Sequence, residues 1–132
     1  MIGRFCALGA LLLLAACGRP EPKSADKFAG LDAEIRTWRE GILASSPLCK
    51  TADQKCESFE VVCKAERDLT PEDQVKGVTA HVVAAMRFAG FDPQMKQAQT
   101  GAETVAFKKT AAGWTRTDRG PVNLSTCGDI AG

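Results

Sequence analysis

The stretch TPEDQVKGVTAHVVAAMRFAGFDP, residues 70–93, decides the fold class because it carries the clearest helix signals in the chain. Thr70 can cap a helix, Pro71 suits the first helical position, and Glu72-Asp73 places acids where the helix dipole favours them. Apolar residues then recur at spacings of three and four on one helical face: Val75, Val78, Val82, Met86 and Ala89. Gly90-Phe91-Asp92-Pro93 is typical of a helix end. The stretch therefore predicts an amphipathic helix.

A similar stripe begins earlier in the chain. Its members also share one helical face: Phe28, Leu31, Ile35, Trp38 and Ile42. Asp26 is placed to cap this helix, and Ser45-Ser46-Pro47 is placed to end it. Trp38 lies in the middle of the stripe, which favours a place in the core over a role as a ligand platform.

Shorter patterns elsewhere indicate strands. Alternation over residues 59–66, with Phe59, Val61, Cys63 and Ala65 on one face, is typical of a half-buried strand. Residues 104–109 and 114–117 flank Thr110-Ala111-Ala112-Gly113, which favours a β-hairpin with glycine in the turn. Residues 94–103 are polar and fit either a loop or an edge strand. The expected fold is α+β, with two amphipathic helices packed on a small antiparallel sheet.

The N-terminus has the layout of a secretory signal peptide. Arg4 precedes an apolar run of about a dozen residues, too short for the roughly 20 residues of a transmembrane helix. The run closes on Leu14-Ala15-Ala16-Cys17-Gly18. This motif resembles the lipobox of bacterial lipoproteins, in which an aliphatic residue and two small residues precede a cysteine. The alternative is an ordinary signal peptide with a chance cysteine near its cleavage site.

The lipoprotein resemblance implies that residues 1–16 are a removed signal peptide and that Cys17 becomes the lipid-bearing first residue. Its sulfur would carry diacylglycerol and, in many bacteria, its amino group an acyl chain. Because Gly18 is not Asp, the resemblance favours the outer membrane over the inner one in a Gram-negative cell, with the domain facing the periplasm. Residues 17–25, with two prolines and alternating charges, would form the tether, and residues 26–132 a single domain.

The charge balance narrows the class of partner. The full chain has 17 Lys and Arg against 16 Asp and Glu, and removal of residues 1–16 takes away only Arg4. The mature chain is therefore neutral. Neutrality argues against a nucleic-acid partner, which would require a basic face, and gives no polybasic attraction to anionic lipid. Membrane residence is thus expected to come from the lipid anchor.

Four cysteines remain in the domain besides Cys17: Cys49, Cys56, Cys63 and Cys127. In an exported domain this number implies two disulfides, and three connectivities are possible. We favour Cys49–Cys56, closing a polar loop, together with Cys63–Cys127, tying the C-terminal tail to a strand. The spacing fits neither a C-x₂-C redox motif nor a zinc site. The sequence indicates no metal and no cofactor, and a redox-labile bridge is the functional alternative.

No catalytic constellation is recognisable in the sequence. His81, the single histidine, is expected at the edge of the helical stripe of residues 75–89, where a half-buried structural role is commoner than a general base. Glu72-Asp73 is explained by the helix dipole. Arg116, Asp118 and Arg119 form a charged patch that could meet a partner, although a solvated hairpin edge accounts for it better.

The sequence therefore favours a non-enzymatic envelope lipoprotein whose domain is an accessory or inhibitory protein-binding module. The alternative is a small-molecule or lipid-binding module that uses a groove between the two helices and the sheet. An enzyme using His81 comes third.

Overall fold

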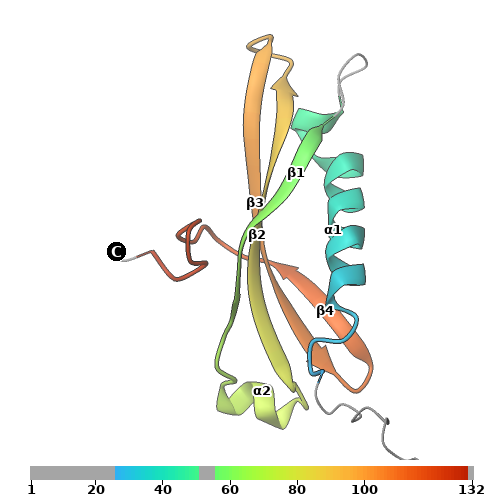
Figure 1. The fold of residues 1–132 in the computed structure, drawn as a ribbon, viewed down its shortest axis with the longest axis vertical. Helices are drawn as coiled ribbons and strands as arrows, with labels where there is room; N and C mark the ends of the chain where they lie inside the picture. The colour runs from blue at the N-terminus through green and yellow to red at the C-terminus, as the bar shows by residue number, and fades with distance from the viewer. Residues whose placement is uncertain (1–25, 51–55, 131–132) are drawn as a thin grey trace, which may run out of the picture.

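The computed structural model describes residues 26–50 and 56–130. Within them, α1 (Leu31–Ser45) is the one long helix, and the short 3-10 helix η2 (Pro47–Cys49) follows it. A brief helix, α2 (Pro71–Val75), lies in the connection between the first two strands. Figure 1 shows α1 along one face of a twisted sheet, with the C-terminal segment on the other face.

Four strands form a single antiparallel sheet in the order β1-β2-β3-β4. Their bounds are β1 (Glu57–Glu66), β2 (Ala80–Asp92), β3 (Gln97–Thr110) and β4 (Gly113–Asp118). Each strand pairs with the next in the chain, so the sheet is a simple meander. The predicted hairpin between β3 and β4 is confirmed, although Gly113, with φ of +117°, is the first residue of β4 and pairs with Thr110.

The predicted helix over residues 70–91 is wrong beyond its first turn. The capping box does form, because Thr70 Oγ1 accepts a hydrogen bond from Asp73 N at 3.0 Å and Asp73 Oδ2 accepts one from Thr70 N at 3.1 Å. The helix nevertheless ends at Val75, and Gly77 adopts a φ of +79°. From Ala80 the chain is strand β2. The fold is therefore mostly β, with one long helix on a four-stranded sheet, and not two helices on a sheet.

The central position of β2 explains this error. Val82, Ala84, Met86 and Phe88 belong to the core beneath α1, whereas Val83 and Ala85 belong to the core on the opposite face. A strand buried on both faces has a nearly continuous apolar sequence, and periodicity alone does not distinguish such a run from a buried helix. Two members of the expected stripe, Val75 and Ala89, are exposed.

The layer between α1 and the sheet holds the larger core. Trp38 is 2% exposed and packs edge-on against Phe107, with ring centroids 5.8 Å apart, so its predicted core position is confirmed. Its Nε1 donates to Glu103 Oε1 at 3.2 Å. The predicted helix end at Ser45 is also confirmed.

The start of α1 differs from the prediction. Gly30, with φ of +89°, is the N-cap, and Phe28 precedes the helix. The Asp26 carboxylate accepts a hydrogen bond from Phe28 N at 3.1 Å and does not cap the helix.

A bulge in β1 divides its side chains between the two layers. Val61 pairs with Met86 and Cys63 with Ala85, so Val62 is the extra residue. Phe59 consequently packs in the core beneath α1, whereas Cys63 and Ala65 pack on the opposite face. The prediction that residues 59, 61, 63 and 65 share one face is therefore wrong.

The C-terminal segment closes the second layer. Val122 and Cys127 are buried there against Val83 and Ala106. The disulfide Cys63–Cys127 attaches the segment to β1, and Cys49–Cys56 joins η2 to the residue before β1. These are the pairings that the sequence favours.

Candidate functional site

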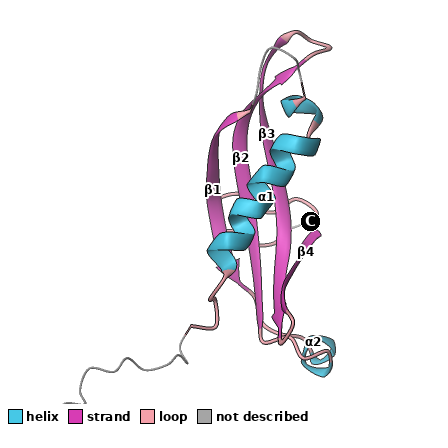
Figure 2. Ribbon diagram, turned by 90° about the vertical axis from the view of Figure 1, so that its right-hand side faces the viewer, coloured by secondary structure: helices cyan, strands magenta, loops and turns pink. Residues whose placement is uncertain are grey.

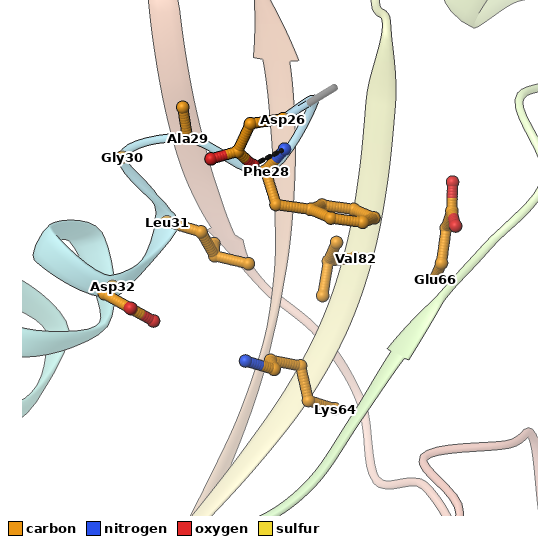
Figure 3. Close-up of a pocket in the computed structure, with 9 residues that line it drawn as sticks. All are labelled: Asp26, Phe28, Ala29, Gly30, Leu31, Asp32, Lys64, Glu66 and Val82. Carbon is orange, nitrogen blue, oxygen red and sulfur yellow. Dashed lines mark hydrogen bonds between the residues drawn. The ribbon is translucent and has the colours of Figure 1, made fainter. Parts of the chain in front are cut away.

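One hollow lies where α1 begins, next to β1. It has a volume of about 500 Å³ and is lined from three segments, the turn before α1, the strand β1 and the strand β2: Asp26, Phe28, Ala29, Gly30, Leu31, Asp32, Lys64, Glu66 and Val82. We call it the Phe28 hollow. Figure 3 shows the Phe28 ring beside Val82, with Lys64 and Glu66 extending from β1. Its floor is apolar and its rim is charged.

The charges on the rim are only partly paired within the protein. Lys27 forms an ion pair with Glu66, and its ammonium lies 5.4 Å from the centroid of the Phe28 ring. Both partners of that pair are about half exposed, at 50% and 45% of their side chains. Such exposed pairs hold side chains weakly, so a ligand could replace the pairing at small cost. The rim carries three carboxylates and Lys64.

A second, smaller hollow lies further along the same helix and strand. It has a volume of about 80 Å³ and is lined by both elements and by β2: Ile35, Arg36, Arg39, Phe59, Val61 and Met86. We call it the Phe59 hollow. α1 and β1 run in opposite directions (Figure 1), and residues of both elements line each hollow. We call the line that joins the two hollows the seam. Its rim changes from mainly acidic at the Phe28 hollow to basic at the Phe59 hollow, where Arg36 and Arg39 lie.

The sequence does not reveal the seam, because its residues come from separate elements and none belongs to a recognisable motif. The helical stripe that includes Phe28, Leu31 and Ile35 and the alternation in residues 59–66 are partial signals, since they mark α1 and β1 as half-buried. The groove expected between two helices and the sheet does not form, because residues 80–92 are a strand.

His81 lies elsewhere, on the face of the sheet opposite α1. It pairs in register with Lys108, whose Nζ donates to Asp73 Oδ1 at 2.8 Å. Burial, together with the positive charge of Lys108, lowers the pKa of His81 below its ordinary value. Its buried Nδ1 has no hydrogen-bond partner within the described residues. A general base requires an orienting partner, and this nitrogen has none among them.

Asp73 and Asp129 also accept ionic hydrogen bonds. The hydrogen bond from Lys108, with those from Thr70, lowers the pKa of Asp73 from 3.8 to about 2. Arg119 donates to Asp129 Oδ1 at 2.7 Å and Arg67 donates to the same atom at 3.2 Å, which lowers the pKa of Asp129. Arg119 of the predicted charged patch therefore contacts the C-terminal segment, whereas Arg116 and Asp118 are exposed on β4.

The remaining sequence predictions concern the lipobox, metal binding and membrane spans. Cys17 and its lipobox lie outside the described residues. In residues 26–50 and 56–130, no group of three or more His, Cys, Asp or Glu side chains is arranged to hold a metal ion. Neither is any helix in that part of the chain long and apolar enough to cross a membrane. Comparison with protein-family models, curated proteins and solved structures finds no match to this chain.

Proposed function

We propose that the protein is a lipid-anchored envelope protein whose domain binds an extended segment of a partner protein along the seam. The observation that carries the proposal is that both hollows adjoin β1, an edge strand of the sheet. In this mode of recognition the free backbone of an edge strand provides affinity, and pockets for alternate side chains provide specificity.

The backbone of β1 suits such a partner next to the Phe28 hollow. Arg67 N donates to His81 O at 2.8 Å, so the backbone groups at position 67 face β2. By the alternation of an antiparallel ladder, those of Lys64 and Glu66 face away from β2, towards the open edge. The side chains of Lys64 and Glu66 line the hollow. A strand paired there would direct alternate side chains into it.

The rim charges specify the chemistry of this partner. At the Phe28 hollow three carboxylates face two lysines, Lys64 and Lys27, and the net negative charge favours a basic side chain at that end of the bound segment. Arg36 and Arg39 at the Phe59 hollow favour an acidic one at the other end. The floor of the Phe59 hollow, with Ile35, Phe59 and Met86, accepts apolar side chains. The expected ligand is an extended segment with apolar residues between opposite terminal charges.

Site-specific photo-cross-linking in the native cells tests the proposal. A photo-reactive residue replaces Val61, which lines the seam and is 36% exposed, and in a matched control it replaces Val75, which lies on α2 and is 87% exposed. We expect one defined protein adduct from position 61 and none from position 75. The double variant Arg36→Glu/Arg39→Glu should weaken the adduct. Equal adducts at both positions, or no adduct at position 61, would contradict the proposal.

A small molecule or lipid in the Phe28 hollow is the second candidate. Its volume of about 500 Å³ lies within the roughly 300–1,000 Å³ of ordinary ligand pockets. Native mass spectrometry of the protein extracted from membranes separates the candidates. A bound molecule of constant mass, with no protein adduct at position 61, would favour the small ligand.

A further inference from the structure

The outer edge of β3 is half covered. β4 pairs only with the part from Val105 to Thr110, and Arg119 N makes a last hydrogen bond to Thr104 O at 3.0 Å. The chain then turns away through Gly120 and Pro121 onto the other face. Figure 2 shows β4 beside the lower part of β3 only. Among the described residues, Gln97–Glu103 is therefore paired on the β2 side alone.

Up to Ala102 this free edge lacks the features that usually prevent strands from pairing between molecules. From Gln97 to Ala102 it has no charged residue and no proline, and its register with β2 is regular throughout. Natural edge strands are normally interrupted by charges, prolines or bulges. The edge of β3 therefore remains competent to pair.

The free edge is also self-complementary. Thr104 O faces outward, and by alternation the backbone groups of Ala102, Thr100 and Ala98 face outward too. Thr100 is the middle residue of Gln97–Glu103. Suppose that a two-fold axis lies midway between the Thr100 residues of two copies. Thr100 then pairs with Thr100 of the second copy, and Ala98 pairs with Ala102. Every outward N–H and C=O at these positions then has a partner, and no charge lies opposite a like charge.

The residues at the two ends of Gln97–Glu103 are also complementary between the two copies. In this register the β2–β3 turn of one copy, which carries Met95 and Lys96, lies level with the point where β4 leaves β3 in the other copy. A hollow of about 490 Å³ lies there, lined by Ala102, Glu103, Thr104, Asp118, Arg119, Pro121, Val122 and Leu124. Met95 is 63% exposed. Its side chain can pack against the apolar residues of the hollow in the other copy, and Lys96 can form an ion pair with Asp118 there.

We propose that two copies of this chain associate through antiparallel pairing of Gln97–Glu103 about a two-fold axis at Thr100. The two four-stranded sheets become one continuous sheet, with both α1 helices on the same face. The seams then lie on the outer flanks, so a dimer would present two of them. This inference does not depend on the protein-binding function proposed for the seam.

A like-charge pair introduced next to the two-fold axis tests the proposal. In the full chain purified in detergent, Thr100→Lys sets two lysines opposite each other, whereas the matched control Thr117→Lys alters an exposed threonine of β4. Sedimentation equilibrium should give a dimer for the parent chain and for Thr117→Lys. We expect Thr100→Lys to raise the dissociation constant at least tenfold. A monomeric parent, or equal effects of the two substitutions, would overturn the proposal.

Cysteine cross-linking gives a second, independent measurement. Directly opposed residues in a hydrogen-bonded antiparallel pair have Cα atoms about 5.5 Å apart, within the range that a disulfide spans. Thr100→Cys should therefore form a covalent dimer under mild oxidation, and Thr117→Cys should not. Equal yields of covalent dimer from the two variants would count against the register.

Discussion

Asp73 shows how one buried side chain can serve two elements. It is 3% exposed, it completes the capping box of α2, and it accepts the hydrogen bond from Lys108 of β3. Together these contacts fix the connection between β1 and β2 against the sheet. The carboxylate form is the one that they stabilise, which is why the pKa falls to about 2.

The first prediction concerns acid unfolding. Because the pKa of Asp73 is lower in the folded state, its contribution to stability is complete above pH 4 and is lost as the pH falls towards 2. In urea titrations, the parent chain should therefore lose stability more steeply over that window than Asp73→Asn. Asp68→Asn, which changes an exposed aspartate of the same connection, is the control. Identical pH profiles for the parent and Asp73→Asn would contradict this account.

The second prediction concerns His81. Its imidazole gives the one histidine resonance of the chain, and burial should place its titration midpoint below 6.5. Removal of the nearby charge in Lys108→Met should raise the midpoint, whereas Lys109→Met, one residue further along β3, should change it less. Because the folded-state pKa is the lower one, protonation favours unfolding, and stability should fall as the pH drops below 6.5. A midpoint at or above 6.5 in the parent would refute the assignment.

At the scale of elements, the third prediction compares the two disulfides. Cys49–Cys56 spans 7 residues and Cys63–Cys127 spans 64. A longer closed loop restricts the unfolded chain more, so the Cys63→Ala/Cys127→Ala pair should lose about 2 kcal/mol more than Cys49→Ala/Cys56→Ala. Urea denaturation of the three oxidised proteins measures the difference. If the two variants lose equal free energies of unfolding, or if Cys49→Ala/Cys56→Ala loses more, the native packing around each bridge outweighs the loop entropy.

The sequence predicts local features well and longer-range features poorly. Four correct predictions depend on near neighbours or on few alternatives: the end of α1 at Ser45, the capping role of Thr70, the strand of residues 59–66 and the pairing of the cysteines. The character of residues 80–92 depends on burial between two layers, which no local pattern encodes. Gly77, directly after the C-cap residue Lys76, is the sequence signal that the helix ends there.

The candidate sites could not be predicted from the sequence either, because they too depend on how separate elements pack. The seam depends on how α1 lies across β1, and a bulge at Val62 sets which residues of β1 face it. The open edge of β3 depends on where β4 stops. The sequence left residues 94–103 between a loop and an edge strand; the part from Gln97 to Glu103 is a strand with one free edge.

At the scale of the whole molecule, the seam and the proposed anchor are related by position. The expected tether of residues 17–25 meets the described domain at Asp26, which lines the Phe28 hollow. An extended tether at about 3.1 Å per residue reaches roughly 20–25 Å. The Phe28 hollow would therefore be the membrane-proximal end of the seam, within reach of partners that lie close to the membrane.

The last prediction tests the anchor itself. Protein extracted from membranes should have the mass of residues 17–132 plus a diacylglyceryl group, with or without a further acyl chain, and Cys17→Ser should lack that increment. Two or three acyl chains bind a membrane durably, while the neutral mature chain has no electrostatic attachment. High salt should therefore leave the parent in the membrane fraction, and detergent should release it. An unmodified mass, or release by salt alone, would mean that the domain is held by something other than lipid on Cys17.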